Sequence, residues 1–171
     1  MILQTRKNFI ELLEKHNCKI GIELGVAGGK FSKFLVDKYC FNEYYCVDSW
    51  NSRSHLVEQY IAAYKRLKCS EITDWQNINI YRATFEEVLP LFPDNYFDFI
   101  YIDGYAHTGQ EGGKTIEDWY CKLKPGGVYA GHDYDKKYIL TKEKVDKFCS
   151  LNNLNLNVTV KDKLNSWWVI K

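Results

Sequence analysis

The sequence predicts an α/β fold, with a doubly wound, mostly parallel sheet and an antiparallel strand near the C-terminus. Apolar segments typical of strands alternate with amphipathic segments typical of helices along most of the 171 residues, which is the pattern of a parallel sheet with helices on both faces. The last two predicted strands are separated by only about six residues, whereas a parallel crossover needs a dozen or more. These two strands must therefore run antiparallel to each other.

The first five elements follow from the spacing of apolar residues. A helix over Thr5–His16 has one apolar face and Thr5 as its candidate N-cap. The buried strand Lys19–Leu24 leads through a glycine turn into a helix over Lys30–Tyr39. A second strand, Tyr44–Val47, precedes a helix over His55–Cys69 that carries an apolar stripe. The stripe consists of Leu56, Tyr60, Ile61, Tyr64 and Leu67.

The middle of the chain continues the alternation. Asn79–Tyr81 is a short third strand, and the following helix over Phe85–Leu91 is ended by prolines. Phe97–Ile102 is a strongly apolar fourth strand. The next helix, Thr115–Leu123, ends before a Lys-Pro-Gly-Gly sequence, and Val128–Gly131 forms the fifth strand.

The C-terminal part contributes one helix and two strands. The helix covers Thr141–Asn152, with Thr141 as its candidate cap, and the strands are Leu156–Val160 and Trp167–Ile170. No linker, repeat or low-complexity segment interrupts the sequence. We therefore expect a single domain over residues 1–171, with an N-terminal helix in residues 1–18 and the α/β core in residues 19–171.

Composition and charge exclude several classes of protein. Hydrophobic residues make up 46% of the chain and charged residues 26%, as in ordinary globular proteins. The net charge of +1 argues against a broad nucleic-acid-binding surface. None of the six cysteines forms a C-x-x-C pair, which favours free thiols in a reducing compartment. Because the sequence also shows no apolar run that could span a bilayer and no signal-peptide pattern, we expect a cytoplasmic protein with no membrane partner.

The glycine turn after the first strand indicates the kind of ligand. Glu23 ends that strand two residues before Gly25, and Gly28 and Gly29 follow in the turn. A turn built for pyrophosphate presents bare N–H groups, and a carboxylate there would repel phosphate. It would attract a cationic ligand instead. S-adenosylmethionine carries an ammonium and a sulfonium group, so the turn favours this methyl donor over NAD.

Acidic and imidazole side chains follow three further strands, at the edge where open α/β sheets bind ligands. Asp48 ends the second strand, where an acid can accept both hydroxyls of a ribose; the alternative is a solvated loop carboxylate. Asp103 ends the fourth strand, and His107 follows it closely. The pair His132-Asp133 follows the fifth strand.

These groups allow two chemistries. A carboxylate and an imidazole at Asp103 and His107 could bind a divalent metal, or orient and deprotonate a hydroxyl group. A simpler interpretation makes His107 a loop residue bonded to backbone, His132 a surface histidine and Asp133 a helix cap. Because the fourth and fifth strands are expected to be neighbours, we favour a site shared by Asp103 with His132 and Asp133.

In these features the chain resembles the class I S-adenosylmethionine-dependent methyltransferases, which have a Rossmann-like, seven-stranded sheet. It is most similar to the small branch that contains the macrolide-sugar O-methyltransferases. The resemblance covers nearly the whole chain, and the combination of motifs is more specific than any one of them. The motifs are Glu23-Leu24-Gly25, Asp48-Ser49-Trp50, Ile102-Asp103-Gly104 with His107, and Leu123–Gly127 with Gly131-His132-Asp133.

The resemblance implies transfer of a methyl group from S-adenosylmethionine to a hydroxyl, with a sugar or glycan as the expected acceptor. Glu23 would face the ammonium of the donor and Asp48 its ribose, while the backbone at the three glycines would approach the methionyl part. Further candidates for contacts to the donor are Trp50, Thr84, Phe85 and Asp103.

For catalysis, the resemblance implies that Asp103, His132 and Asp133 could hold Mg²⁺ or Mn²⁺. His107 is the expected general base, Asp103 would stabilise the imidazolium, and His132 is the competing base. A chain of this length leaves little sequence to cover the acceptor, which suits a large acceptor or a site completed by a second copy in a homo-oligomer. Two other functions remain open: a nicotinamide-dependent oxidoreductase and a non-catalytic domain that binds a partner.

Overall fold

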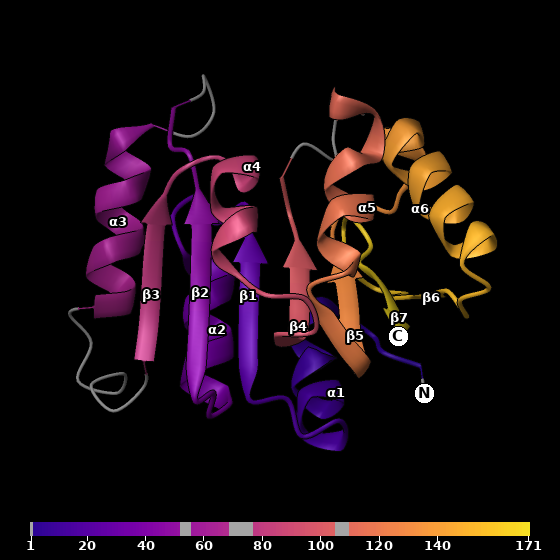
Figure 1. Cartoon of the computed structure of the whole chain (residues 1–171), viewed down its shortest axis with the longest axis horizontal. Coiled ribbons are helices and arrows are strands. Elements are labelled where there is room, and N and C mark those ends of the chain that lie inside the picture. The colour runs from indigo at the N-terminus through magenta and orange to yellow at the C-terminus, as the bar shows by residue number, and fades with distance from the viewer. Residues whose placement is uncertain (1, 52–55, 69–76, 105–109) are drawn as a thin grey trace.

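The structure is a computed structural model that describes residues 2–51, 56–68, 77–104 and 110–171. Its centre is a sheet of seven strands in the order β3-β2-β1-β4-β5-β7-β6. The strands β1 to β5 pair in parallel, β7 runs antiparallel to β5, and β6 runs antiparallel to β7. The predicted fold class and the antiparallel pairing of the last two strands are thus confirmed (Figure 1). The strands are β1 (Ile20–Leu24), β2 (Glu43–Asp48), β3 (Asn77–Arg82), β4 (Phe97–Ile102), β5 (Leu123–Gly131), β6 (Asn157–Val158) and β7 (Trp167–Ile170).

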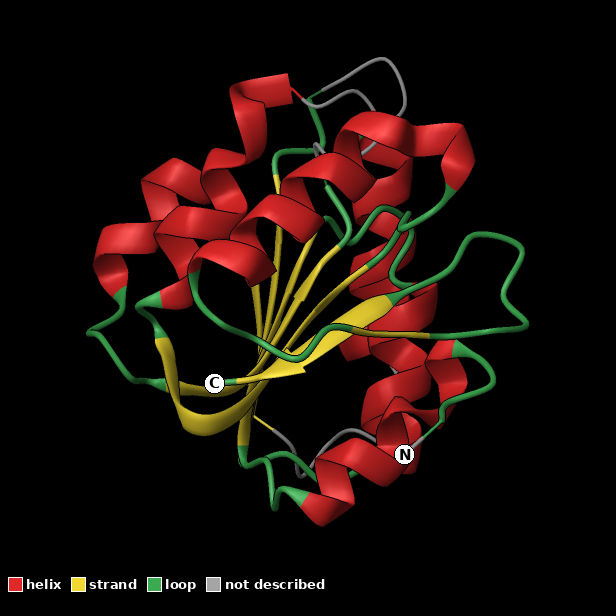
Figure 2. Cartoon of the chain, turned by 90° about the vertical axis from the view of Figure 1, so that its right-hand side faces the viewer, coloured by secondary structure: helices red, strands yellow, loops and turns green. Residues whose placement is uncertain are grey.

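Helices cover both faces of the sheet, so that the sheet lies between two helical layers (Figure 2). One hydrophobic cluster joins the sheet to α1, α2 and α3, and a second joins the opposite face to α4, α5 and α6. Alternating strand residues divide between them: Phe99 and Tyr101 of β4 belong to the first cluster, and Ile100 and Ile102 to the second. The helices are α1 (Phe9–Lys15), α2 (Lys30–Lys38), α3 (Val57–Lys68), α4 (Phe85–Val88), α5 (Lys114–Tyr120) and α6 (Ile139–Leu151).

The boundary between α5 and β5 differs clearly from the prediction. The helix predicted over Thr115–Leu123 ends at Tyr120, and β5 begins at Leu123 instead of Val128. The strand accommodates the Pro-Gly-Gly sequence because its pairing with β4 shifts register between Phe97 and Phe99. The predicted N-cap Thr141 is wrong, because α6 already begins at Ile139 and Thr141 is buried within it.

The predicted N-cap Thr5 is confirmed in part, and the predicted apolar stripe of the third helix is only partly buried. Thr5 is the N-cap of a 3-10 turn (Arg6–Asn8) that leads directly into α1. On α3, Leu67 is buried as predicted, whereas Ile61 and Tyr64 are exposed, as is Leu56, which directly precedes the helix. The predicted ends of that helix, His55 and Cys69, lie outside the described residues.

The cysteines of the described ranges are free thiols: Cys18, Cys46 and Cys149 are buried, and Cys40 and Cys121 are exposed. No helix within those ranges has the length and apolarity needed to cross a membrane.

Candidate functional site

The carboxyl ends of β2, β1, β4 and β5 lie next to one another at one edge of the sheet (the upper edge in Figure 1). The topology therefore brings together the ends that carry Asp48, Glu23, Asp103 and the His132-Asp133 pair, as the sequence predicts. The functional roles of these residues stay predictions.

The glycine turn lies directly against the end of β4. Gly25 has a φ of +95°, and a Cβ at this position would lie 2.4 Å from the carbonyl oxygen of Asp103. No side chain fits in that space, and the backbone conformation itself favours glycine. The turn that follows β1 is thereby fixed beside Asp103.

The other two glycines of the turn mediate packing. Gly29 has a φ of +72°, and its Cβ would lie 3.0 Å from the Cα of Ala63 in α3. Gly28 is near Arg66, whose guanidinium donates to the Gly28 carbonyl oxygen. The structure thus explains both glycines by contacts with α3, and the approach of their backbone to a donor stays a prediction.

Asp48 organises the turn through three backbone hydrogen bonds. Its Oδ2 accepts from the N–H groups of Val26 and Ala27 at 3.0 and 2.9 Å, and its Oδ1 accepts from that of Trp50 at 2.9 Å. Trp50 is itself buried, and its indole N–H donates to the carbonyl oxygen of Ala27 at 2.8 Å. Asp48 and Trp50 therefore hold the turn in shape, whatever they contact in a ligand.

Glu23 lies beneath the turn and is only 2% exposed. The hydroxyl group of Ser32, in the first turns of α2, donates to its carboxyl group. Burial raises the pKa of Glu23 to about 8, and the hydrogen bond from Ser32 opposes this shift. The carboxyl group is therefore mostly protonated at neutral pH, and the expected contact with a donor ammonium stays a prediction.

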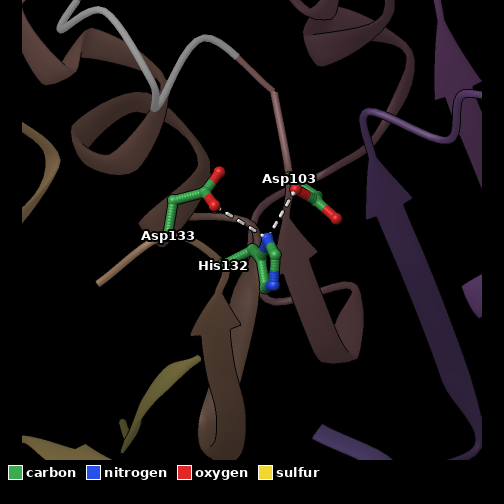
Figure 3. A group of neighbouring side chains, drawn as sticks. All are labelled: Asp103, His132 and Asp133. Atoms are coloured by element: carbon green, nitrogen blue, oxygen red, sulfur yellow. Dashed lines mark ion pairs between the residues drawn. The ribbon is translucent and has the colours of Figure 1, made fainter. Parts of the chain in front are cut away.

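Asp103, His132 and Asp133 form a compact cluster across β4 and β5 (Figure 3). The Nδ1 atom of His132 lies 3.3 Å from Oδ1 of Asp103 and 3.0 Å from Oδ1 of Asp133. Burial acts to lower the pKa of His132, but hydrogen bonds to the two carboxylates outweigh it and raise the pKa to about 9.

The cluster fits a divalent cation. Each of the three residues offers one ligand atom, and these atoms lie within 4.8 Å of one another. Two carboxylates and an imidazole are ligands typical of Mg²⁺, Mn²⁺ or a related ion, whereas a structural zinc site typically has thiolate ligands. The donor set is thus the one that the sequence predicts for a metal.

Arg6 joins this group, and sequence reasoning missed it. Its Nη1 atom lies 3.3 Å from Oδ2 of Asp103, and its guanidinium lies 4.8 Å from the ring centre of Phe31. The side chain is one-third exposed, at 33%. A single arginine near the N-terminus belongs to no motif, so no sequence signal marks it.

The remaining predicted site residues have different outcomes. Thr84 caps α4 by accepting a hydrogen bond from the backbone of Glu87 at 3.3 Å. The ring of Phe85 packs against Gly104, directly after Asp103. Both lie near the expected donor site, and their contacts to the donor stay predictions. His107 falls outside the described residues.

Comparisons with known proteins agree with this arrangement. A family model described as a methyltransferase domain matches residues 22–134, which include all of the strand ends discussed above. Among curated proteins, no sequence matches the chain.

Several solved structures share the fold. An O-methyltransferase from Bacillus cereus, in complex with S-adenosylhomocysteine, has a TM-score of 0.73 at 16% identity, over 96% of this chain and 80% of that one. The O-methyltransferase TomG from Streptomyces achromogenes, involved in tomaymycin synthesis and bound to S-adenosylmethionine, has a TM-score of 0.69 at 14% identity, over 96% of this chain and 78% of that one. A tRNA methyltransferase from Aquifex aeolicus has a TM-score of 0.66 at 15% identity, over 99% of this chain and 72% of that one. At such identities the likeness concerns the fold alone.

Proposed function

Because the chain belongs to the methyltransferase domain family, we propose that it transfers a methyl group from S-adenosylmethionine to a hydroxyl group of a sugar or other polyol. The observation that carries this proposal is the position of the Asp103–His132–Asp133 cluster directly beside the glycine turn. A donor over the turn would place its methyl group near polar side chains that can orient an acceptor oxygen. The solved O-methyltransferases with bound donor or product support the same assignment.

Methyl transfer is an in-line displacement at carbon, so that positioning and deprotonation of the acceptor are the main tasks of the protein. The turn fixed by Asp48 and Gly25 would position the donor. Asp103, His132 and Asp133 would hold a divalent cation, which supplies orientation of the acceptor oxygen and a lower pKa for its hydroxyl. His107 is the predicted group that accepts the proton. His132 is the competing candidate only where it holds no cation and has first lost the proton that its raised pKa of about 9 keeps at neutral pH.

The acceptor is the least constrained part of the proposal. A sugar or the end of a glycan is the acceptor that the resemblance implies, and a second copy of the chain could complete the site. A screen of hydroxylated acceptors with isotope-labelled donor tests this part directly. Incorporation into sugars and not into catechols or amines is the expected result.

Titration calorimetry with S-adenosylhomocysteine and with NAD tests the donor. We expect the first to bind and the second not to bind. The Asp48→Ala variant should bind S-adenosylhomocysteine more weakly by about 1–3 kcal/mol, because the turn loses three hydrogen bonds to a charged group. Asp37→Ala, which removes an acid that pairs with Lys33 on α2, is the matched control and should bind normally. Binding of NAD without binding of the homocysteine product would refute the proposal.

A further inference from the structure

Resting on the proposed function, we propose that Arg6 binds the carboxylate of the methionyl group of the donor. This carboxylate is the one anionic group of S-adenosylmethionine. A residue that binds it would help to select intact donor over fragments and analogues that lack the amino-acid part.

The position of Arg6 is the first argument. The methionyl part of the donor is expected at the turn around Gly25, and Gly25 lies in contact with the backbone of Asp103. The guanidinium of Arg6 contacts the side chain of the same Asp103 and stacks on Phe31, in the first turn of α2. Arg6 therefore reaches the same end of the sheet from the side of α1 and α2.

The charges around this point are the second argument. The strand ends at the expected donor site carry the carboxyl groups of Asp48, Asp103 and Asp133, in addition to the buried and mostly protonated Glu23. These groups suit an ammonium and a ribose, but they would repel a carboxylate unless a cation lay nearby. Arg6 supplies such a cation beside Oδ2 of Asp103. The protonated His132 lies against the carboxylates of Asp103 and Asp133, and Arg66 donates to the carbonyl oxygen of Gly28.

The donors of Arg6 are the third argument. A guanidinium has five N–H donors in a planar arrangement that matches a carboxylate with two parallel hydrogen bonds. The guanidinium contacts Asp103 and also the hydroxyl group of Tyr101, which leaves other N–H donors. The side chain is one-third exposed, so a ligand can reach it from solvent.

The backbone at Arg6 is held in place by the far end of the chain. Its N–H donates to Oδ2 of Asp162 at 2.7 Å, and the carbonyl oxygen of Gln4 accepts from the N–H groups of Val160 and Lys161. The N-terminal segment is thus fixed to the connection between β6 and β7. A fixed arginine loses less conformational freedom when it binds a ligand.

The test compares two ligands, S-adenosylhomocysteine and its decarboxylated analogue, which keeps the amine and lacks only the carboxylate. Calorimetry on the Arg6→Gln variant should show about 10- to 100-fold weaker binding of S-adenosylhomocysteine, the range expected for a lost charge-assisted hydrogen bond. Binding of the decarboxylated analogue should be unchanged. Lys7→Gln is the matched control, because Lys7 is the next cation in the same turn and lies over the ring of Phe34.

Other outcomes separate this inference from the proposed function. If the unmodified protein binds neither ligand, the proposed function fails. If the unmodified protein binds both and Arg6→Gln weakens both equally, Arg6 acts only by positioning Asp103, and the inference is overturned. Unchanged binding of both ligands overturns it as well. If Arg6→Gln does not fold, the same two ligands are compared on Arg6→Lys. If this variant prefers S-adenosylhomocysteine over the decarboxylated analogue as strongly as the unmodified protein does, Arg6 does not bind the carboxylate through two parallel hydrogen bonds.

Discussion

Asp103 has two different neighbours on its two carboxylate oxygens. Oδ1 faces His132 in the cluster with Asp133, and Oδ2 faces Arg6. The contact between Asp103 and His132 could be predicted from the sequence, because side chains at the ends of neighbouring parallel strands lie close together. The contact with Arg6 could not, since it joins residues 97 positions apart and Arg6 reaches the site from a short turn with no motif. A lone cation carries no periodic or spacing signal.

Glu23 gives a prediction at the same scale. Its folded-state pKa of about 8 lies above the ordinary value of 4.5, so that between these pH values the folded protein keeps a proton that the unfolded chain has lost. The stability of the protein should therefore fall as pH rises from about 5 to about 8, by on the order of 1.4 kcal/mol per pH unit from this group alone. The Glu23→Gln variant should lack this contribution.

Chemical denaturation at a series of pH values measures the difference between the two proteins. Glu87→Gln, which changes an exposed acid at the start of α4, is the control and should keep the slope of the unmodified protein. Equal slopes for the unmodified protein and Glu23→Gln would mean that Glu23 is ionised in the folded state.

Among the elements, those with a strong apolar run were predicted best. β4 has the predicted bounds, Phe97–Ile102, because every residue of the strand except Asp98 belongs to one of the two hydrophobic clusters. The start of β5 was not predictable from local rules, because proline and glycine ordinarily mark a turn. There the pairing with β4, which lies outside the local sequence, decides the conformation of Leu123–Gly127.

The contact between α2 and α3 gives a prediction for the elements. The Gly29→Ala variant should be less stable by about 1–3 kcal/mol, because its Cβ would meet the backbone of Ala63 at 3.0 Å and would sit on a residue with φ of +72°. Gly28→Ala is the matched control, since the nearest atom is the flexible end of Arg66 at 3.2 Å. Urea unfolding of both variants measures the effect. A smaller loss for Gly29→Ala than for Gly28→Ala would contradict the packing argument.

For the whole molecule, the alternation of strands and helices was enough to predict the parallel sheet, and the short connection between the last two strands was enough to predict that they are antiparallel. The alternation also placed the functional groups at one edge. The link between the N-terminal segment and the β6–β7 connection could not be predicted. It consists of hydrogen bonds between backbone groups and one to the carboxylate of Asp162, and such bonds leave no pattern in the sequence.

A metal bound between β4 and β5 should stabilise the whole fold, because its ligands belong to two strands that are separated in sequence by α5. Any ligand that binds only the folded state adds RT ln(1 + [L]/Kd), about 2.7 kcal/mol at a hundred times Kd. Scanning calorimetry should therefore show a higher melting temperature with Mn²⁺, and return of the original value after chelation.

The control for this experiment separates specific binding from general effects of salt. Asp133→Asn should reduce the shift, because a neutral amide oxygen binds a divalent cation more weakly than a carboxylate does. Asparagine also adopts the αL conformation that Asp133 has, with φ of +61°, so the fold should be kept. Asp118→Asn, which changes an acid paired with Lys114 on α5, should keep the full shift. An equal shift in both variants would argue against the cluster as the metal site.

The hydrogen bond from Arg6 to Asp162 also has a consequence for the order of synthesis. Arg6 leaves the ribosome 156 residues before Asp162 does. A nascent chain that already contains the glycine turn and both β4 and β5 can form the contacts of Arg6 with Asp103 and Phe31, but it still lacks the hydrogen bond that holds the backbone of Arg6. If Arg6 binds the donor carboxylate, the backbone that carries it is held in its final position only after translation has passed the β6–β7 connection.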